Sequence, residues 1–135
     1  MSIDAGRLKH LEMIQQVISR MANNSFLVKG WSVTLLSVIL AIAVKNELHA
    51  LAWVAFIPCI MFWTLDGYFL RQERLFRKLW DRYREEPQET PTNFSMNTSV
   101  VDAEVDSWLK VSFSKTLFIF HGVLFVLLLL IAITS

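Results

Sequence analysis

The sequence predicts an all-α membrane protein with three transmembrane helices, an N-terminal amphipathic helix and a cytoplasmic helical hairpin that extends two of the spans. Two observations favour this fold class. Apolar and aromatic residues make up 54% of the 135 residues against 19% charged, and they gather in three runs, 26–44, 48–65 and 116–133. At 1.5 Å per residue, helices of these lengths reach roughly 27 to 29 Å, which matches a bilayer core about 30 Å thick.

The same composition excludes several other classes of protein. About 80 residues remain outside the runs, too few for a separate catalytic domain of usual size, so we do not expect an enzyme. A single cysteine, Cys59, permits no intrachain disulfide, and His10, His49 and His121 are far apart along the chain. The usual phosphate-binding, dinucleotide and zinc motifs are missing. We therefore expect no cofactor and no metal site.

The apolar runs divide the chain into four segments. We expect residues 1–25 to form the cytoplasmic amphipathic helix, 26–70 a two-span transmembrane hairpin, 71–115 the cytoplasmic helical hairpin and 116–135 the third transmembrane helix. The first run follows a structured-looking polar segment and no small-residue cleavage site, so we interpret it as a retained span rather than a signal peptide.

Lys and Arg residues are distributed very unevenly about the three runs. Twelve of the 13 lie before or at the start of the first run, or between the second and the third; only Lys45 lies in the turn between the first two. Because positive residues in short loops stay on the cytoplasmic side during insertion, we expect the N-terminus and residues 66–115 in the cytoplasm. The 45–49 turn and the C-terminus are then external.

Residues 4–22 predict an amphipathic helix whose apolar stripe repeats at helical spacing. The stripe consists of Leu11, Ile14, Ile18 and Met21, with Leu8 and Val17 beside them. It can lie on the membrane surface or pack against other helices, and we favour packing because the charge is mixed and no aromatic side chain anchors the stripe. Asn23, Asn24 and Ser25 can compete for helical hydrogen bonds, which predicts a bend there.

The second span is expected to continue as a helix to about residue 85. No helix breaker follows Gly67, and Glu73, Arg77 and Asp81 place opposite charges four residues apart. Pro58 is expected to kink the span. The extension has an apolar stripe that must be covered: Leu75, Phe76, Leu79, Trp80 and Tyr83.

A polar turn at 87–97 should end this helix, and the next is expected to begin at Thr98 or Ser99 and to continue unbroken into the third span. Its apolar stripe is Val101, Val105, Trp108 and Leu109. Two long helices joined by a short turn run antiparallel, so we expect the two stripes to pack against each other in the cytoplasm.

Several polar residues are expected near one level at the cytoplasmic end of the spans, where they form a candidate gate or polar collar. They are Asn23, Asn24, Ser25, Lys29, Asp66, Tyr68 and His121. A carboxylate at the bilayer centre costs about 3 kcal/mol and is usually a functional clue, whereas Asp66 is expected near the cytoplasmic end of its span, where the cost falls and snorkelling is possible. Lys29 enters from the same side and is expected to pair with Asp66, either to fix helix packing or to serve a function. His121 either senses pH or lines a gate, or is simply hydrogen bonded to a neighbour.

Four basic residues share one face of the extended second helix: Arg71, Arg74, Lys78 and Arg82. Guanidinium groups bind phosphate in pairs, so this face is a candidate site for an anionic ligand such as a nucleotide or oligonucleotide. The alternative is contact with lipid headgroups, which the positive-inside rule already requires.

Two stretches resemble a known class of proteins. Residues 20–31 (RMANNSFLVKGW) and 62–78 (FWTLDGYFLRQERLFRK), with two closely spaced spans, resemble small bacterial inner-membrane proteins of anti-phage defence neighbourhoods, in particular the SLATT-like membrane effectors. RipA-type oligomeric membrane proteins are also similar. The resemblance covers about residues 5 to 85 and implies a bacterial inner-membrane effector that oligomerises or opens when a partner enzyme makes a nucleotide signal. The third span departs from the two-span pattern of that class.

Three transmembrane helices from one chain are too few to surround an aqueous path, so a pore requires several copies of the chain. The leading hypothesis is a homo-oligomeric membrane effector, ion-conducting or membrane-perturbing and gated from the cytoplasm. The alternative is a non-conducting subunit that docks a cytoplasmic partner protein through the 71–113 hairpin. A membrane-embedded enzyme or transporter is the weakest hypothesis, because one carboxylate and one histidine are too few functional groups for a catalytic or transport site.

Overall fold

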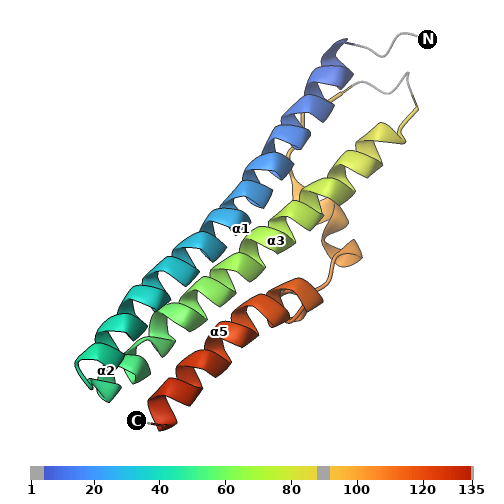
Figure 1. Ribbon diagram of the computed structural model, residues 1–135. Coiled ribbons are helices and arrows are strands. Elements are labelled where there is room, and N and C mark those ends of the chain that lie inside the picture. Colours follow the sequence, from blue (N-terminus) through green and yellow to red (C-terminus); the bar gives the residue numbers. More distant parts are fainter. Residues whose placement is uncertain (1–4, 88–91, 135) are drawn as a thin grey trace.

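The computed structural model describes residues 5–87 and 92–134, apart from the side chain of His49. This described part is helical and contains no strand, as predicted. Its elements are α1 (Ala5–Lys45), α2 (His49–Val54), α3 (Phe56–Arg84), the 3-10 helix η1 (Thr98–Glu104), α4 (Trp108–Ser112) and α5 (Lys115–Ile133). Figure 1 shows α1 and α3 side by side, with α5 beside the half of α3 that is nearer to α2.

Three helical stretches within the described part are long and apolar enough to cross a membrane: Ala5–Lys45, Ala50–Arg84 and Lys115–Ile133. The predicted three-span membrane architecture is therefore confirmed. The first two stretches extend far beyond their apolar runs. We call the parts outside these runs, residues 5–24, 68–87 and 92–112, the extramembrane bundle.

α1 is one continuous helix of 41 residues, which at 1.5 Å per residue is about 60 Å long. The bend predicted at residues 23–25 is therefore wrong. The hydroxyl of Ser25 donates to Asp66 of α3 rather than bonding to its own backbone, and the side chain of Asn23 is exposed. Because these side chains do not compete for the backbone hydrogen bonds, the helix runs straight through.

The second span is interrupted at Ala55, which separates α2 from α3. The cause is Pro58, which has no N–H to donate to the carbonyl of Val54 and whose ring crowds that carbonyl. α2 ends at Val54, four residues before the proline. Ala55 itself keeps helical dihedral angles (φ −63°, ψ −17°), so α2 and α3 continue one another across it. The kink predicted at Pro58 stays a prediction.

The centre of the extramembrane bundle is an apolar core. Ile14 and Ile18 of α1 pack with Leu75 and Leu79 of α3 and with Val101 of η1. Partly buried side chains surround them: Phe76, Trp80, Tyr83, Met96 and Val105. The N-terminal stripe thus packs on other helices, as favoured, and the stripe of the extended second helix is covered as expected.

The second arm of the hairpin differs from the sequence prediction. Instead of one helix running into the third span, the chain forms η1, α4 and α5 with breaks between them. Val105 is extended (φ −121°, ψ 140°), and so are Ser107 and Ser114. The Ser107 hydroxyl accepts from the amide of Lys110 and starts α4. Serine favours such N-cap positions. Ser114 also precedes a helix, α5, but its side chain makes no cap hydrogen bond.

A second apolar core fills the space between the three spans. Leu36 of α1, Ala55, Cys59 of α3 and Leu128 of α5 are fully or almost fully buried there. Side chains that pack on them are Ile39, Leu40, Phe56, Leu124 and Phe125. The centre of a single protomer is therefore closed by apolar side chains.

Candidate functional site

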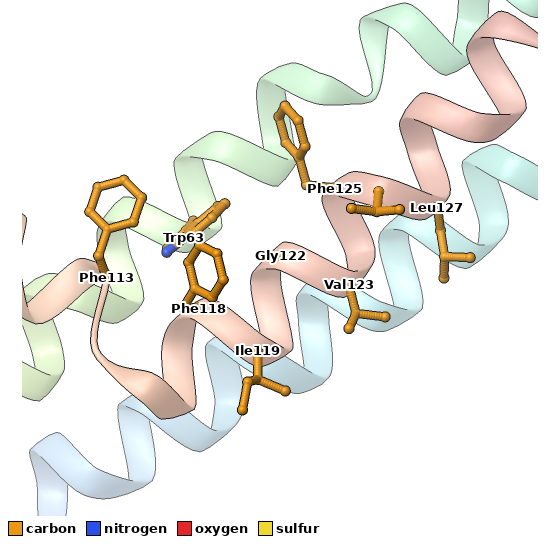
Figure 2. A pocket seen from close by; sticks show the side chains of 9 residues that line it. Trp63, Phe113, Phe118, Ile119, Gly122, Val123, Phe125 and Leu127 are labelled. Carbon is orange, nitrogen blue, oxygen red and sulfur yellow. The ribbon is translucent and has the colours of Figure 1, made fainter.

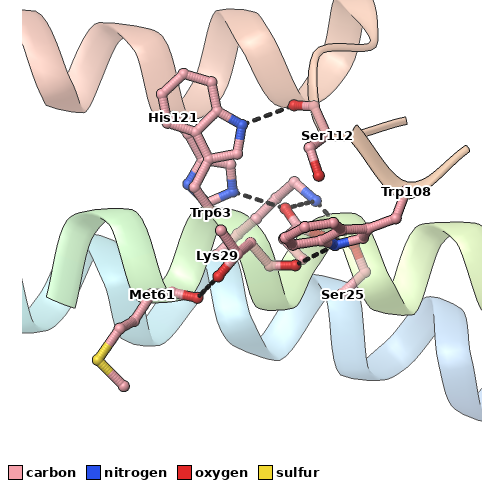
Figure 3. A network of polar contacts seen from close by, with 9 residues as sticks. Ser25, Lys29, Met61, Trp63, Trp108, Ser112 and His121 are labelled. Carbon is pink, nitrogen blue, oxygen red and sulfur yellow. Dashed lines mark hydrogen bonds and ion pairs between the residues drawn. The ribbon is translucent and has the colours of Figure 1, made fainter. Parts of the chain in front are cut away.

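Four polar side chains from three spans meet at Asp66, between the two apolar cores. We call Ser25, Lys29, Asp66 and His121 the quartet. The Lys29 ammonium lies 2.6 Å from Oδ2 of Asp66, Nε2 of His121 lies 2.7 Å from the same oxygen, and the Ser25 hydroxyl donates to Oδ1. Lys29 also donates to the oxygen of Ser25, at 2.8 Å. Figure 3 shows these contacts and the indoles beside them.

Each member is placed by the period of its helix. Ser25 and Lys29 are four residues apart on α1 and lie on its α3-facing side, together with the buried Ser32. Asp66 and His121 have no exposed surface, whereas the Lys29 side chain is 20% exposed. The ion pair predicted between Lys29 and Asp66 is confirmed, and Lys29 keeps a route to the surface.

The close packing next to Asp66 depends on Gly67. A Cβ atom at this position would lie 2.1 Å from Oγ and 3.2 Å from Cα of Ser112. Only glycine allows the end of α4 to approach α3 this closely. This role of Gly67 was not predicted from the sequence. A glycine directly after the charged Asp66 in a helix was the feature that could have indicated close packing.

Two indole N–H groups fasten α4 to α3 next to the quartet. Trp63 donates to the carbonyl of Ser112 at 2.7 Å, and Trp108 donates to the carbonyl of Thr64 at 3.0 Å. The ring of Trp63 is also stacked on the imidazole of His121, with centroids 5.8 Å apart and an interplanar angle of 15°. Trp63 thus holds both the α4 segment and His121, a role that the sequence analysis did not assign.

The quartet balances a charge that is costly at membrane depth. A lone ionised carboxylate there is unfavourable, and it becomes tolerable when an opposite charge and hydrogen-bond donors surround it. Asp66 has one ammonium and two further donors. The arrangement joins all three spans through one carboxylate, so a change at Asp66 affects the packing of each.

The other predicted collar residues lie elsewhere. Asn23 is exposed and Asn24 half-buried. Tyr68 is 49% exposed and packs edge-on against Phe69. The described contacts join none of these three to the quartet.

The basic face of α3 lies against an acidic segment. Arg71 donates to the carboxylate of Asp102 at 2.9 Å and to the carbonyl of Asp106 at 3.0 Å. Arg74 and Lys78 line a groove that Glu104 and Asp106 also line, and Arg82 is exposed. An anionic ligand on this face would therefore meet carboxylates as well as cations, a complication that the sequence analysis did not foresee.

The N-terminal end of α1 carries two buried polar side chains that the sequence analysis also missed. The guanidinium of Arg7 donates to backbone carbonyls in the last turn of α3 and just beyond it: those of Tyr83 (2.8 Å), Arg84 (3.0 Å), Pro87 (2.9 Å) and Glu86. These are carbonyls that a helix C-terminus leaves without partners. His10 bonds to the carbonyl of Ser95 at 2.7 Å and packs on Tyr83. α1 is thereby fixed to both arms of the hairpin.

An apolar groove runs along the outer side of α5 (Figure 2). Trp63, Phe113, Phe118 and Phe125 are among the side chains that line it. Gly122 lies in the groove, and a Cβ atom there would have no atom within 4 Å. At the depth of the span this surface must contact lipid or another helix.

Over residues 5–87 and 92–134, no three His, Cys, Asp or Glu side chains lie close enough together to hold a metal ion. The comparisons with known proteins gave no match to a family model, to a curated protein or to a solved structure.

Proposed function

We propose that the chain is a homo-oligomeric membrane effector, ion-conducting or membrane-perturbing, whose state is controlled from the extramembrane bundle through the quartet. The observation that carries the proposal is the burial of Asp66 between Lys29 and His121, on three different spans. Ionisable residues at membrane depth are rare and usually belong to ion pathways or switches. A carboxylate that joins every span is well placed to set their packing.

The extramembrane bundle is mechanically continuous with the quartet. α1 and α3 each run unbroken from the bundle core at Ile14 and Leu79 to Lys29 and Asp66. A shift of one helix against the other in the bundle must therefore change the distance between Lys29 and Asp66. This continuity provides a route from a signal outside the bilayer to the charges inside it.

Oligomerisation is required for conduction because one protomer encloses no path. Leu36, Ala55, Cys59 and Leu128 close its centre. A path must run between copies, and the groove around Gly122 offers a surface where another helix can approach closely.

For location, we propose the bacterial inner membrane with the extramembrane bundle in the cytoplasm and the C-terminus external. The twelve-to-one distribution of Lys and Arg supports this orientation. A role in anti-phage defence, with a nucleotide or oligonucleotide signal, is proposed on the resemblance of residues 20–31 and 62–78 to SLATT-like effectors. Arg74 and Lys78, which line the groove and form no ion pair among the described residues, are the groups we assign to such a signal.

Ion flux from liposomes tests the proposal. Removing one member of a buried ion pair costs about 3–5 kcal/mol, so Asp66→Asn and Lys29→Met are expected to raise the basal flux roughly tenfold or more by destabilising the closed packing. The matched control is Asp81→Asn, on the same helix but in the bundle and half exposed, and its flux should equal that of the unaltered protein.

Absence of flux from the unaltered protein and from both quartet variants would contradict the proposal. In that case the alternative gains support: a non-conducting subunit that docks a cytoplasmic partner protein through residues 71–113. The groove of mixed charge beside Arg74 and Lys78 is the surface that favours it.

A further inference from the structure

We propose that the quartet is a proton-binding site, that the proton is taken up at Nδ1 of His121, and that its uptake releases α1 from α3. This deepens the proposed function, and only the flux measurement below rests on that function. The proton reaches the quartet from the side of the extramembrane bundle.

The hydrogen bonds fix which nitrogen of His121 is available. Asp66 is a carboxylate that accepts from Lys29 and Ser25, so its bond to Nε2 of His121 requires the ring to donate there. A neutral imidazole has only one N–H, which leaves Nδ1 as an acceptor. Nδ1 is buried and has no hydrogen-bond partner among the described residues, so it is the basic atom of the site.

Two groups beside the ring can make favourable contacts with an imidazolium. Asp66 faces one edge at 2.7 Å, and the indole of Trp63 lies parallel to the ring, with centroids 5.8 Å apart. An aromatic face attracts a cation, and tryptophan does so most strongly. The indole cannot turn away easily, because its N–H is held by the carbonyl of Ser112.

Polar groups lead away from the site toward the extramembrane bundle, whereas on the opposite side the buried hydroxyl of Ser32 is followed by an apolar barrier. Toward the extramembrane bundle, the hydroxyls of Ser112 and Ser114 are buried without partners among the described residues, and Ser112 touches the backbone next to Asp66. On the other side, Leu36, Cys59 and Leu128 form an apolar barrier. The proton therefore enters from the bundle and is not passed through the protomer.

Protonation changes the charge balance at Asp66. The ionisable groups that meet there are Lys29 of α1, Asp66 of α3 and His121 of α5. The neighbouring basic group of α4, Lys110, is exposed and lies 3.6 Å from Asp106. With His121 protonated, two cations share one carboxylate. Lys29 is the one with exposed surface, so Lys29 is displaced and the bond between α3 and α5 remains.

The direct test is a nitrogen-15 NMR titration of histidine-labelled protein in lipid nanodiscs, with signals assigned through His10→Gln and His49→Gln. At the high-pH end of the titration His121 is expected to carry its proton on Nε2, and Nδ1 should become protonated before the protein unfolds at the low-pH end. A His121 that carries its proton on Nδ1 at high pH, or that never becomes protonated in this range, overturns the proposal.

The second measurement is the distance between α1 and α3 as a function of pH. Spin labels at Phe26→Cys and Tyr68→Cys, both exposed positions, in a Cys59→Ser background should report a longer α1 to α3 distance at low pH. The change should be lost in His121→Gln, and a pH response that survives in His121→Gln contradicts the assignment.

Measuring ion flux from liposomes distinguishes failure of the proton site from failure of the proposed conducting function. Acid on the bundle side should raise the liposome flux severalfold. Titration and helix separation without flux would refute the conducting function and leave the proton site standing. Flux without titration of His121 would refute the proton site alone.

Discussion

Asp66 illustrates how much one residue at membrane depth depends on its neighbours. A lone carboxylate costs about 3 kcal/mol at the bilayer centre and less toward the end of a span. Asp66 directly follows the apolar run 48–65, and an ammonium, an imidazole and a hydroxyl surround its carboxylate. The partners come from sequence positions 25, 29 and 121. The ion pair between Lys29 and Asp66 was predictable, because both residues were expected at the same depth in their spans. The bond to His121 was not predictable, because nothing in the sequence fixes how α5 is rotated about its axis.

Gly67 offers a test at the residue scale. Gly67→Ala would place a Cβ within 3.2 Å of the backbone of Ser112, and such overpacking costs about 1–3 kcal/mol. The gain in helix propensity from glycine to alanine offsets about 1 kcal/mol. We expect a net loss of up to about 2 kcal/mol in the free energy of unfolding, measured by denaturant titration in detergent micelles.

Gly30→Ala is the matched control for this test. It lies on α1, where an added Cβ meets nothing within 4 Å, so it should leave stability unchanged or raise it by up to about 1 kcal/mol. Equal effects of the two substitutions would contradict the role assigned to Gly67.

At the scale of the elements, the apolar runs were sufficient to place the spans, and local preferences failed where tertiary contacts competed with them. Asn23, Asn24 and Ser25 favour a bend locally, yet Ser25 bonds to a residue 41 positions away and α1 stays straight. In the 98–114 segment the opposite happened. The apolar stripe suggested one helix, but the cap at Ser107 and the extended backbone at Val105 and Ser114 divided it. Hydrophobic periodicity alone does not reveal such breaks.

The end of α3 provides the test at this scale. Arg7 donates to four carbonyls around the last turn of α3, and a hydrogen bond to a charged group contributes about 1.5–3 kcal/mol. Arg7→Met is therefore expected to let this turn fray, with faster amide hydrogen exchange at residues 83–86. Lys9→Met removes a positive charge from the same helix at an exposed position and should leave exchange unchanged; similar exchange in both variants would refute the capping role.

At the scale of the whole molecule, the chain is a long two-helix rod with a third span packed on one half (Figure 1). One apolar core lies in the extramembrane bundle and the other between the spans, and the quartet lies between them. Movement of α1 against α3 therefore connects the extramembrane bundle with these charges. The proposed function, its control from the cytoplasm and the entry of the proton all depend on which side of the membrane the bundle occupies.

Single-cysteine labelling in intact cells tests this central point most directly. In a Cys59→Ser background, Asn46→Cys marks the turn after α1 and Ser99→Cys marks η1, and both positions are exposed. A membrane-impermeant maleimide should label position 46 from outside and position 99 only after permeabilisation. Labelling of position 99 from outside, or of both positions equally before permeabilisation, would contradict the account.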